Sequence, residues 1–306
     1  MISEYCNLCP RACKVNRAAG DRGICGETQT LRVARASLHM WEEPCLSGTK
    51  GSGTVFFTGC TLHCVYCQNK MIANGNYGKE ITVERLADIF LEQQERGANN
   101  INLVTPTHFI PQIVKALEIS KSRGMDLPIV YNTSSYENVD ALKMLDGLVD
   151  IYLPDLKYLS PELSLKYSKA PDYFDVASLA IKEMVRQAGE PQFAKRHNEM
   201  GIEYGMMKKG VIVRHLLLPG QLEDSKKIVK YLYETYGDKI YISIMNQYTP
   251  MPGIEEKYPE LGRKITPKEY DTLVDYAIEL GVENGFIQEG ETASESFIPE
   301  FDMEGV

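Results

Sequence analysis

The chain has 306 residues, of which 43% are hydrophobic and 25% charged, and its net charge at pH 7 is −9. This is the composition of an ordinary globular protein with one large core. Lysine and arginine are scattered rather than gathered in a basic stripe, so we expect neither a nucleic acid nor a membrane as a partner. No basic segment followed by an apolar run opens the chain, and no stretch approaches the ~18 apolar residues of a membrane span. We therefore expect a cytoplasmic protein.

Seven of the eight cysteines lie in two tight groups, which in a reducing compartment indicates metal ligation rather than disulfides. The first group consists of Cys6, Cys9, Cys13 and Cys25. Four thiols are a complete ligand set for zinc or for an iron-sulfur cluster, and the spacing does not decide between them. We expect residues 1–52 to form a metal-binding extension. Cys45, near His39, is expected to be a free buried thiol, although it could also replace one of the four ligands.

From residue 53 onward, predicted strands alternate with predicted amphipathic helices, as is typical of a parallel α/β sheet. The expected strands are 54–58, 101–105, 128–132, 149–153, 211–218 and 240–244. The expected helices are 82–96, 111–124, 137–146, a short one from Ser160-Pro161, 172–188, 223–236 and 266–281. In the last helix, the side chains expected to face inward are Tyr270, Leu273, Val274, Ala277 and Ile278.

Six β/α units are too few for a full eight-stranded barrel and predict a partial, open (β/α)6 barrel over residues 53–306. Residues 190–210 are polar and contain glycines, so they predict a long loop of the kind that serves as a lid or a binding segment. The apolar tail at 297–301 is expected to dock on the core. Ligands of such sheets collect at the carboxyl ends of the strands. The residues expected there are Cys60, Thr105, Asn132, Asp155 and Pro219.

The second cysteine group directly follows the first expected strand and consists of Cys60, Cys64 and Cys67. A mononuclear zinc site normally has four protein ligands, and this trio has no fourth cysteine close downstream. A cubane 4Fe-4S cluster bound by three cysteines keeps one iron open, which can chelate a small molecule and pass it an electron. A zinc site completed from elsewhere and three buried structural thiols are the alternatives.

With the aromatic Tyr66 just before its last cysteine, the trio resembles the motif of the radical S-adenosylmethionine superfamily. The resemblance implies a partial-barrel core and a 4Fe-4S cluster whose catalytic ligands are Cys60, Cys64 and Cys67. It further implies that the amino and carboxylate groups of S-adenosylmethionine bind the open iron, and that Tyr66 lies beside this cofactor. Reductive cleavage would then give methionine and a 5'-deoxyadenosyl radical, which removes a hydrogen atom from the substrate.

Further contacts to S-adenosylmethionine are expected at several strand ends. Many family members carry a Gly-Gly-Glu type sequence after their second strand, whereas this chain has Thr105-Pro106-Thr107. The two threonine hydroxyls or backbone carbonyls could serve instead, and an ordinary turn is the alternative. Asn132 and Ser134 are candidates for ribose or carboxylate contacts, although both residue types also favour turns. Arg214 lies inside an apolar strand and needs an acceptor, which a carboxylate of the cofactor or a structural aspartate would provide.

Other segments narrow the resemblance to one branch. Asp155-Leu156-Lys157 and residues 213–220 look like the corresponding segments of pyruvate formate-lyase activating enzymes, and this likeness covers roughly residues 53–250. The Cys-rich start, residues 39–45 and residues 105–108 are more similar to a group within that branch labelled pyruvate formate-lyase 3 activating enzymes.

The resemblance to this branch implies that the radical abstracts a hydrogen atom from a backbone glycine of a partner enzyme, so that the substrate enters as a protein or peptide loop. It also implies a flavodoxin- or ferredoxin-type reductant and places Asp155 and Lys157 at the cofactor. Two alternatives stay open. One is radical modification of a small molecule, which needs a closed pocket rather than an open groove. The other is a non-enzymatic iron-sulfur protein for electron transfer or sensing.

Overall fold

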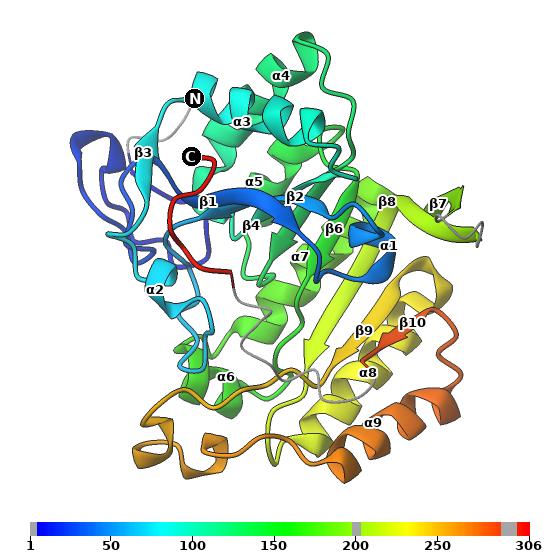
Figure 1. Ribbon diagram of the computed structural model, residues 1–306. Coiled ribbons are helices and arrows are strands. Elements are labelled where there is room, and N and C mark those ends of the chain that lie inside the picture. The colour runs from blue at the N-terminus through cyan, green and yellow to red at the C-terminus, as the bar shows by residue number, and fades with distance from the viewer. Residues whose placement is uncertain (1–4, 198–202, 289–298) are drawn as a thin grey trace.

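The structure is a computed structural model that describes residues 5–197, 203–288 and 299–306 (Figure 1). The strands form one sheet in the order β10-β9-β8-β6-β5-β4-β2-β1-β3, with β7 paired to β8. The parallel strands are β2 (Ser52–Phe57), β4 (Ile101–Val104), β5 (Ile129–Thr133), β6 (Ile151–Pro154), β8 (Glu203–Leu216), β9 (Tyr241–Met245) and β10 (Gly285–Ile287). The antiparallel strands are β1 (Leu31–His39), β3 (Lys79–Ile81) and β7 (Gln192–His197). The helices are α1 (Pro44–Ser47), α2 (Lys70–Ala73), α3 (Val83–Glu95), α4 (Ile110–Ser122), α5 (Val139–Leu142), α6 (Pro161–Ser168), α7 (Tyr173–Ala188), α8 (Leu222–Tyr236) and α9 (Pro267–Leu280).

The expected partial barrel is confirmed, because all six predicted strands are present as β2, β4, β5, β6, β8 and β9. Successive side chains of these strands point to opposite faces of the sheet, and both faces are buried. In β2, Phe57 packs in the main core, with its ring 5.9 Å from that of Phe109 at the start of α4. Phe56 points to the inner face, where it joins a second apolar cluster with Phe301 of the tail. Phe56 also borders the cavity described below, so the site lies on this inner face of the sheet.

Local capping explains why α3 and α9 begin where the sequence predicts. The Thr82 hydroxyl accepts a hydrogen bond of 3.1 Å from the backbone N–H of Arg85 at the start of α3. Thr266 and Glu269 form a reciprocal capping box at the start of α9. The predicted helix at 137–146 is shorter, because α5 ends at Leu142 and continues as a 3-10 turn.

The inward face predicted for α9 is partly wrong. Tyr270, Leu273 and Ala277 are buried, whereas Ile278 is 65% exposed. The helix packs beside α8, and its buried stripe consists of Tyr270, Leu273 and Ala277 with the half-buried Val274 at its margin, while Ile278 lies outside this stripe. No helix within the described ranges is both long and apolar enough to cross a membrane.

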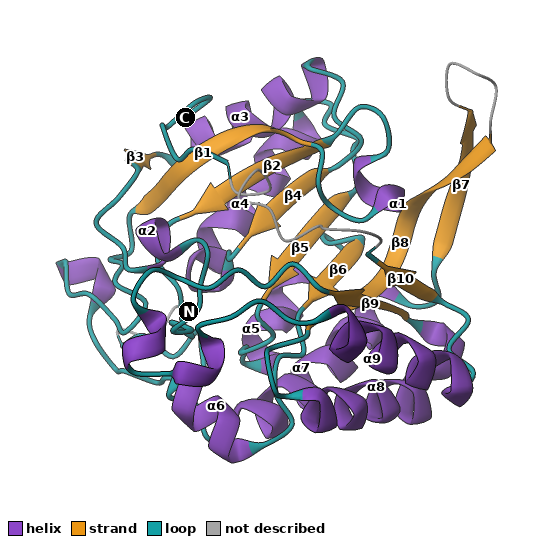
Figure 2. Ribbon diagram, turned by 60° about the horizontal axis from the view of Figure 1, so that its bottom comes forward, coloured by secondary structure: helices purple, strands orange, loops and turns teal. Residues whose placement is uncertain are grey.

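The loop predicted at 190–210 is wrong, because the described residues of this segment form the antiparallel ribbon of β7 and β8. β8 pairs with β6 only from Gly210 onward, so the ribbon extends from the amino end of the barrel strand and projects beyond the sheet (Figure 2). Parallel strands carry ligands at their carboxyl ends, and the ribbon lies at the opposite end. It is therefore not a lid over the strand ends. Apolar and polar residues do not alternate regularly along this segment, so the sequence pattern did not predict its strands.

Besides β7, three strands were not predicted, and two of them extend the sheet beyond β2. β1 pairs antiparallel with β2 on one side and with β3 on the other, while β10 adds a short parallel strand beside β9. The expected docking of the tail is confirmed from Pro299 onward, and residues 297–298 lie outside the described part of the chain. Met303 donates its backbone N–H to the carbonyl of Ala34, and Ala36 donates to the carbonyl of Glu304.

Candidate active site

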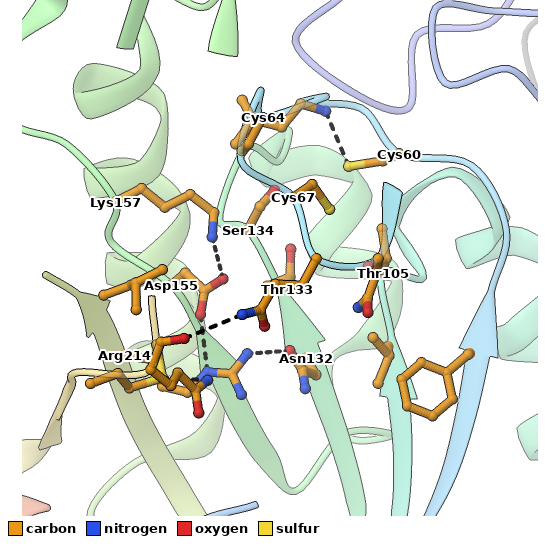
Figure 3. Close-up of a pocket in the computed structure, with 18 of the residues that line it drawn as sticks. Cys60, Cys64, Cys67, Thr105, Asn132, Thr133, Ser134, Asp155, Lys157 and Arg214 are labelled. Atoms are coloured by element: carbon orange, nitrogen blue, oxygen red, sulfur yellow. Dashed lines mark hydrogen bonds and ion pairs between the residues drawn. The ribbon is translucent and has the colours of Figure 1, made fainter. Parts of the chain in front are cut away.

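A cavity of about 250 Å³ lies at the carboxyl ends of the parallel strands (Figure 3). The strand ends and the loops that follow them supply most of its polar lining. These residues are Cys60, Cys64, Cys67, Thr105, Asn132, Thr133, Ser134, Asp155, Lys157 and Arg214. The end of β1, the segment after it and the start of the docked tail add His39, Trp41, Glu42 and Pro299 to the lining. The predicted gathering of Cys60, Thr105, Asn132 and Asp155 is confirmed, and Pro219 is absent from the described lining.

The cysteine loop leaves β2 through Gly59, whose φ of +81° is the left-handed region that glycine favours. A side chain there would also collide with the extension, because an added Cβ would lie 2.6 Å from the carbonyl oxygen of Cys25. Beyond this turn the three thiols Cys60, Cys64 and Cys67 border the same cavity. The Cys60 sulfur accepts a hydrogen bond of 3.4 Å from the backbone N–H of Leu62.

The three thiols fit an iron-sulfur cluster by their chemistry. Thiolates are the donors that such clusters prefer, and in a cubane each thiolate binds a different iron, so they need to border one cavity rather than meet at one point. Burial raises the pKa of the Cys67 thiol to about 12 and also raises that of Cys60. A cluster bound here would supply the positive charge that stabilises them as thiolates. Among the described residues, no three His, Cys, Asp or Glu side chains converge closely enough to hold a single ion.

Opposite the thiols, the cavity ends in a set of paired charges, which we call the charged floor: Arg214, Asp155, Lys157 and Glu42 (Figure 3). The Arg214 guanidinium lies 3.0 Å from Asp155 and 3.2 Å from Glu42, and it donates a hydrogen bond of 2.7 Å to the side-chain carbonyl of Asn132. The Lys157 ammonium lies 2.7 Å from Asp155. Burial alone would raise the pKa of Asp155, but Lys157 and Arg214 outweigh it and hold this pKa below its ordinary value.

The predicted cofactor residues do not all reach the cavity. Thr105 lines it and has a φ of +57°, in the left-handed region that favours glycine. Thr107 instead turns away, and its buried hydroxyl donates a hydrogen bond of 2.6 Å to Glu137. Asn132 and Ser134 line the cavity, but the acceptor oxygen of Asn132 is bound to Arg214. Arg214 thus finds its acceptors within the protein, and the structural aspartate that one of the two sequence hypotheses expected is among them as Asp155.

Tyr66 also lines the cavity, yet its hydroxyl faces away from it. The ring packs edge-on against the rings of Tyr158, Tyr167 and Tyr248, with centroids 6.2 to 6.4 Å apart. Its hydroxyl lies 2.6 Å from that of Tyr158. This arrangement places the Tyr66 hydroxyl in a buried cluster behind the cysteine loop rather than against a ligand.

Sequence reasoning missed the carboxylate that completes the charged floor. Glu42 lies 172 positions before Arg214, which it contacts, and its other oxygen accepts a hydrogen bond of 2.8 Å from the side-chain amide of Asn102. The only signal in the sequence was the pair Glu42-Glu43 between the aromatic Trp41 and Pro44. A carboxylate pair in such a place is commonly exposed, so its burial required the structure.

The N-terminal extension packs directly against the cysteine loop. The carbonyl of Cys25 accepts a hydrogen bond of 3.2 Å from the N–H of Cys60, and the His63 ring lies 2.7 Å from the carbonyl of Ile24. Burial raises the pKa of Cys25 to about 11 and that of Cys9 to about 12. Cys45 is buried elsewhere, in an apolar cluster with β5, β6 and β8, where the expectation of a free buried thiol places it.

Comparison with known proteins shows a family match and a relative of similar length coverage. The model of the Radical SAM superfamily matches residues 54–232. "Uncharacterized protein MJ0674" of Methanocaldococcus jannaschii is 28% identical over 286 residues, which cover 90% of this chain and 75% of the relative.

The fold is shared with one solved structure at low sequence identity, and a second is similar to a lesser degree. SuiB of Streptococcus suis bound to precursor peptide SuiA has a TM-score of 0.50 at 14% identity, covering 76% of this chain and 47% of SuiB. The maturase HydG of Carboxydothermus hydrogenoformans has a TM-score of 0.46 at 14% identity, covering 80% of this chain and 59% of HydG. The chain thus spans about half the length of SuiB. Because the family match covers more than half of the chain and includes the cysteine loop and the strand ends, the protein belongs to the radical S-adenosylmethionine superfamily, whose domain implies a 4Fe-4S cluster and S-adenosylmethionine.

Proposed function

We propose that this protein applies radical S-adenosylmethionine chemistry to a protein or peptide, in the manner of the enzymes that activate glycyl radical enzymes. The observation that carries the proposal is the cavity in which three thiols of one loop face the charged floor (Figure 3). Both segments that resemble pyruvate formate-lyase activating enzymes contribute to it, one through Asp155 and Lys157 and the other through Arg214. SuiB, which shares the fold, binds a precursor peptide.

The residues of the cavity have distinct roles in this proposal. Cys60, Cys64 and Cys67 would bind the cluster, which together with S-adenosylmethionine supplies the 5'-deoxyadenosyl radical. Lys157 is held by Asp155 and presents a cation near the cysteines, where a carboxylate ligand would bind. Arg214 keeps Asp155 in place from the other side. A rigid floor of this kind orients a ligand before reaction, which is the main contribution that a protein makes to cofactor chemistry.

The first experiment tests the radical-generating core. The protein is reconstituted anaerobically with iron and sulfide, given S-adenosylmethionine and dithionite, and assayed for 5'-deoxyadenosine by mass spectrometry. We expect product in the wild type and none with Cys64→Ala. Cys45→Ala is the matched control, because it removes a buried thiol outside the cavity and should leave the product unchanged. Iron-sulfur absorbance without any product would favour the electron-transfer or sensing alternative.

The second experiment tests the substrate class. Extract from cells grown in deuterated medium is divided by ultrafiltration into a macromolecular and a small-molecule fraction, and each is added to the reconstituted enzyme. Hydrogen abstraction moves deuterium from the substrate into 5'-deoxyadenosine. Deuterium transfer from the macromolecular fraction alone, with an electron paramagnetic resonance signal of a glycyl radical, is the expected result. Transfer from the small-molecule fraction alone would contradict the proposal.

We also propose that Cys6, Cys9, Cys13 and Cys25 bind a second metal centre. The support is the count of four thiols, a complete ligand set, and the nearness of two of them to Gly23, where an added Cβ would lie 3.1 Å from the Cys13 sulfur and 3.4 Å from the Cys25 sulfur. Elemental analysis of wild type and Cys25→Ala tests this. We expect the variant to lose zinc, or iron beyond the first cluster, while the trio keeps its own. Equal metal content in both proteins would contradict the proposal.

A further inference from the structure

A chain of buried hydroxyl groups ends on one of the cysteine ligands. The Ser168 hydroxyl at the end of α6 lies 3.2 Å from the sulfur of Cys64. The Tyr158 hydroxyl lies 2.8 Å from the Ser168 oxygen, and the Tyr66 hydroxyl lies 2.6 Å from that of Tyr158. Ser168 and Tyr158 are each 1% exposed, and Tyr66 is 6% exposed. We call Tyr66, Tyr158 and Ser168 the hydroxyl relay.

The direction of the hydroxyl relay follows from the number of protons available. A thiolate can only accept a hydrogen bond, so the Ser168 hydroxyl must donate its single proton to Cys64. The Ser168 oxygen is then left to accept from Tyr158, whose own oxygen in turn accepts from Tyr66. All three bonds therefore point toward the sulfur, and hydrogen bonds aligned in this way in a low-dielectric interior polarise one another.

A neighbouring serine shows that this orientation is not the default of the helix. Ser164, one turn earlier in α6 and equally buried, donates to the carbonyl of Pro161 at 3.1 Å. Serine hydroxyls in helices commonly bond such a preceding carbonyl. Ser168 instead bonds a sulfur 104 positions away in the sequence.

The end of α6 is also tied to the cysteine loop by its backbone. The Arg11 guanidinium donates to the carbonyls of Ser168 at 2.9 Å and Thr61 at 2.8 Å, which connects the two segments. Val65 donates its N–H to the carbonyl of Tyr167 at 2.9 Å. The distance between the Ser168 hydroxyl and Cys64 is therefore set by the fold rather than by the side chain alone.

We propose that Ser168, oriented by Tyr158 and Tyr66, is a positioning residue that raises the reduction potential of the cluster bound at Cys64. Hydrogen bonds to the sulfur ligands favour the reduced cluster, because it carries the additional negative charge. The inference rests on a cluster at the cysteine trio, and it is independent of the substrate.

The test is a redox titration of the reconstituted full chain without S-adenosylmethionine, followed by electron paramagnetic resonance. The signal of the trio is identified by its loss in Cys64→Ala. In Ser168→Ala we expect the ratio of reduced to oxidised cluster at a given potential to fall about tenfold, which is ~59 mV for a one-electron couple. Tyr158→Phe should shift the potential in the same direction by less, and Tyr66→Phe by less again. The matched control Ser164→Ala should leave it unchanged.

An unchanged or raised potential in a fully iron-loaded Ser168→Ala would overturn the inference while leaving the proposed function intact. If Ser168→Ala does not take up iron, Tyr158→Phe decides, because it keeps the serine hydroxyl and shortens only the relay. A lowered potential in that variant supports the inference, and an unchanged one overturns it. Absence of any cluster signal in the wild type would overturn both the inference and the proposed function.

Discussion

The two walls of the cavity are stabilised in opposite ways. The wall of thiols is backed by neutral hydroxyls and tyrosine rings, whereas the charged floor consists of ion pairs around Arg214. Removing a neutral hydroxyl leaves no charge behind, but removing one member of a buried ion pair leaves its partner uncompensated. Truncating a side chain behind the thiols should therefore change the reduction potential of the cluster. Truncating a side chain of the charged floor should instead lower the free energy of unfolding.

The largest effect is expected from breaking the charged floor. Arg214→Met removes the cation that Asp155 and Glu42 share, and such losses in buried pairs cost about 3–5 kcal/mol of unfolding free energy. Urea unfolding measures the change. Arg123→Met, which breaks the exposed pair with Asp88, is the matched control and should cost less than about 1 kcal/mol. Equal losses in both variants would contradict the distinction between buried and exposed pairs.

Glu137 is a buried carboxyl that is surrounded by hydroxyls instead of cations, and it tests the difference between neutral and charged partners further. One oxygen of the buried Glu137 accepts hydrogen bonds from Thr107, Tyr131 and Thr133, and the other has no hydrogen-bond partner among the residues that the structure describes. Burial raises the pKa of Glu137 to about 7, even though the three hydroxyls oppose the shift. The folded state therefore holds a proton that the unfolded state releases from pH 4.5 upward, so stability is lost as the pH rises toward 7.

Glu137→Gln should remove this loss. Relative to wild type, the variant should gain roughly 3 kcal/mol of unfolding free energy between pH 4.5 and pH 8. Urea unfolding of both proteins at the two pH values gives the difference directly. Because Asp155 has a lowered pKa, it acts in the opposite sense, and its contribution is lost only at acidic pH. A difference between the two proteins that does not change with pH would rule out a protonated Glu137.

The smallest effect concerns the cation that faces the thiols. Lys157→Met leaves Asp155 paired with Arg214, so the loss of stability should be smaller than in Arg214→Met, and a carboxylate ligand would lose its partner. We expect the Kd for S-adenosylmethionine to rise about tenfold, which corresponds to ~1.4 kcal/mol. Isothermal titration of the reconstituted protein measures it. Lys143→Met, at an exposed pair with Asp140, should leave the Kd unchanged, and an unchanged Kd in Lys157→Met would remove this residue from the ligand site.

The predictable part of this molecule is the part with strong local patterns. The six parallel strands from β2 to β9 contain apolar runs bounded by turn residues, and the thiols that follow β2 are close together in sequence, so both could be predicted from the chain. β1 was not predicted because Arg32 and Arg35 interrupt its apolar pattern. Only the structure shows that Arg35 pairs with Asp302 and Glu304 of the tail.

The unpredicted part of the site depends on contacts between distant residues. Glu42 meets Arg214 across 172 positions, and Ser168 meets Cys64 across 104 positions. Neither contact produces a periodic pattern in the sequence, because only one side chain from each segment takes part in it. Thr107 shows the converse, since its position after a strand suggested the cavity while its side chain turned toward Glu137.

The docked tail also covers part of the edge of β1. β3 pairs with β1 only over Leu31–Val33, and the next outward-facing backbone groups of β1, those of Ala34 and Ala36, bond to Met303 and Glu304 (Figure 1). Gly305 approaches so closely that an added Cβ would lie 2.1 Å from the carbonyl oxygen of Ala36. An uncovered strand edge is a template on which a strand of a second copy can pair. A chain without residues 299–306 would keep its barrel and expose such a template, so its characteristic failure would be self-association rather than loss of the fold.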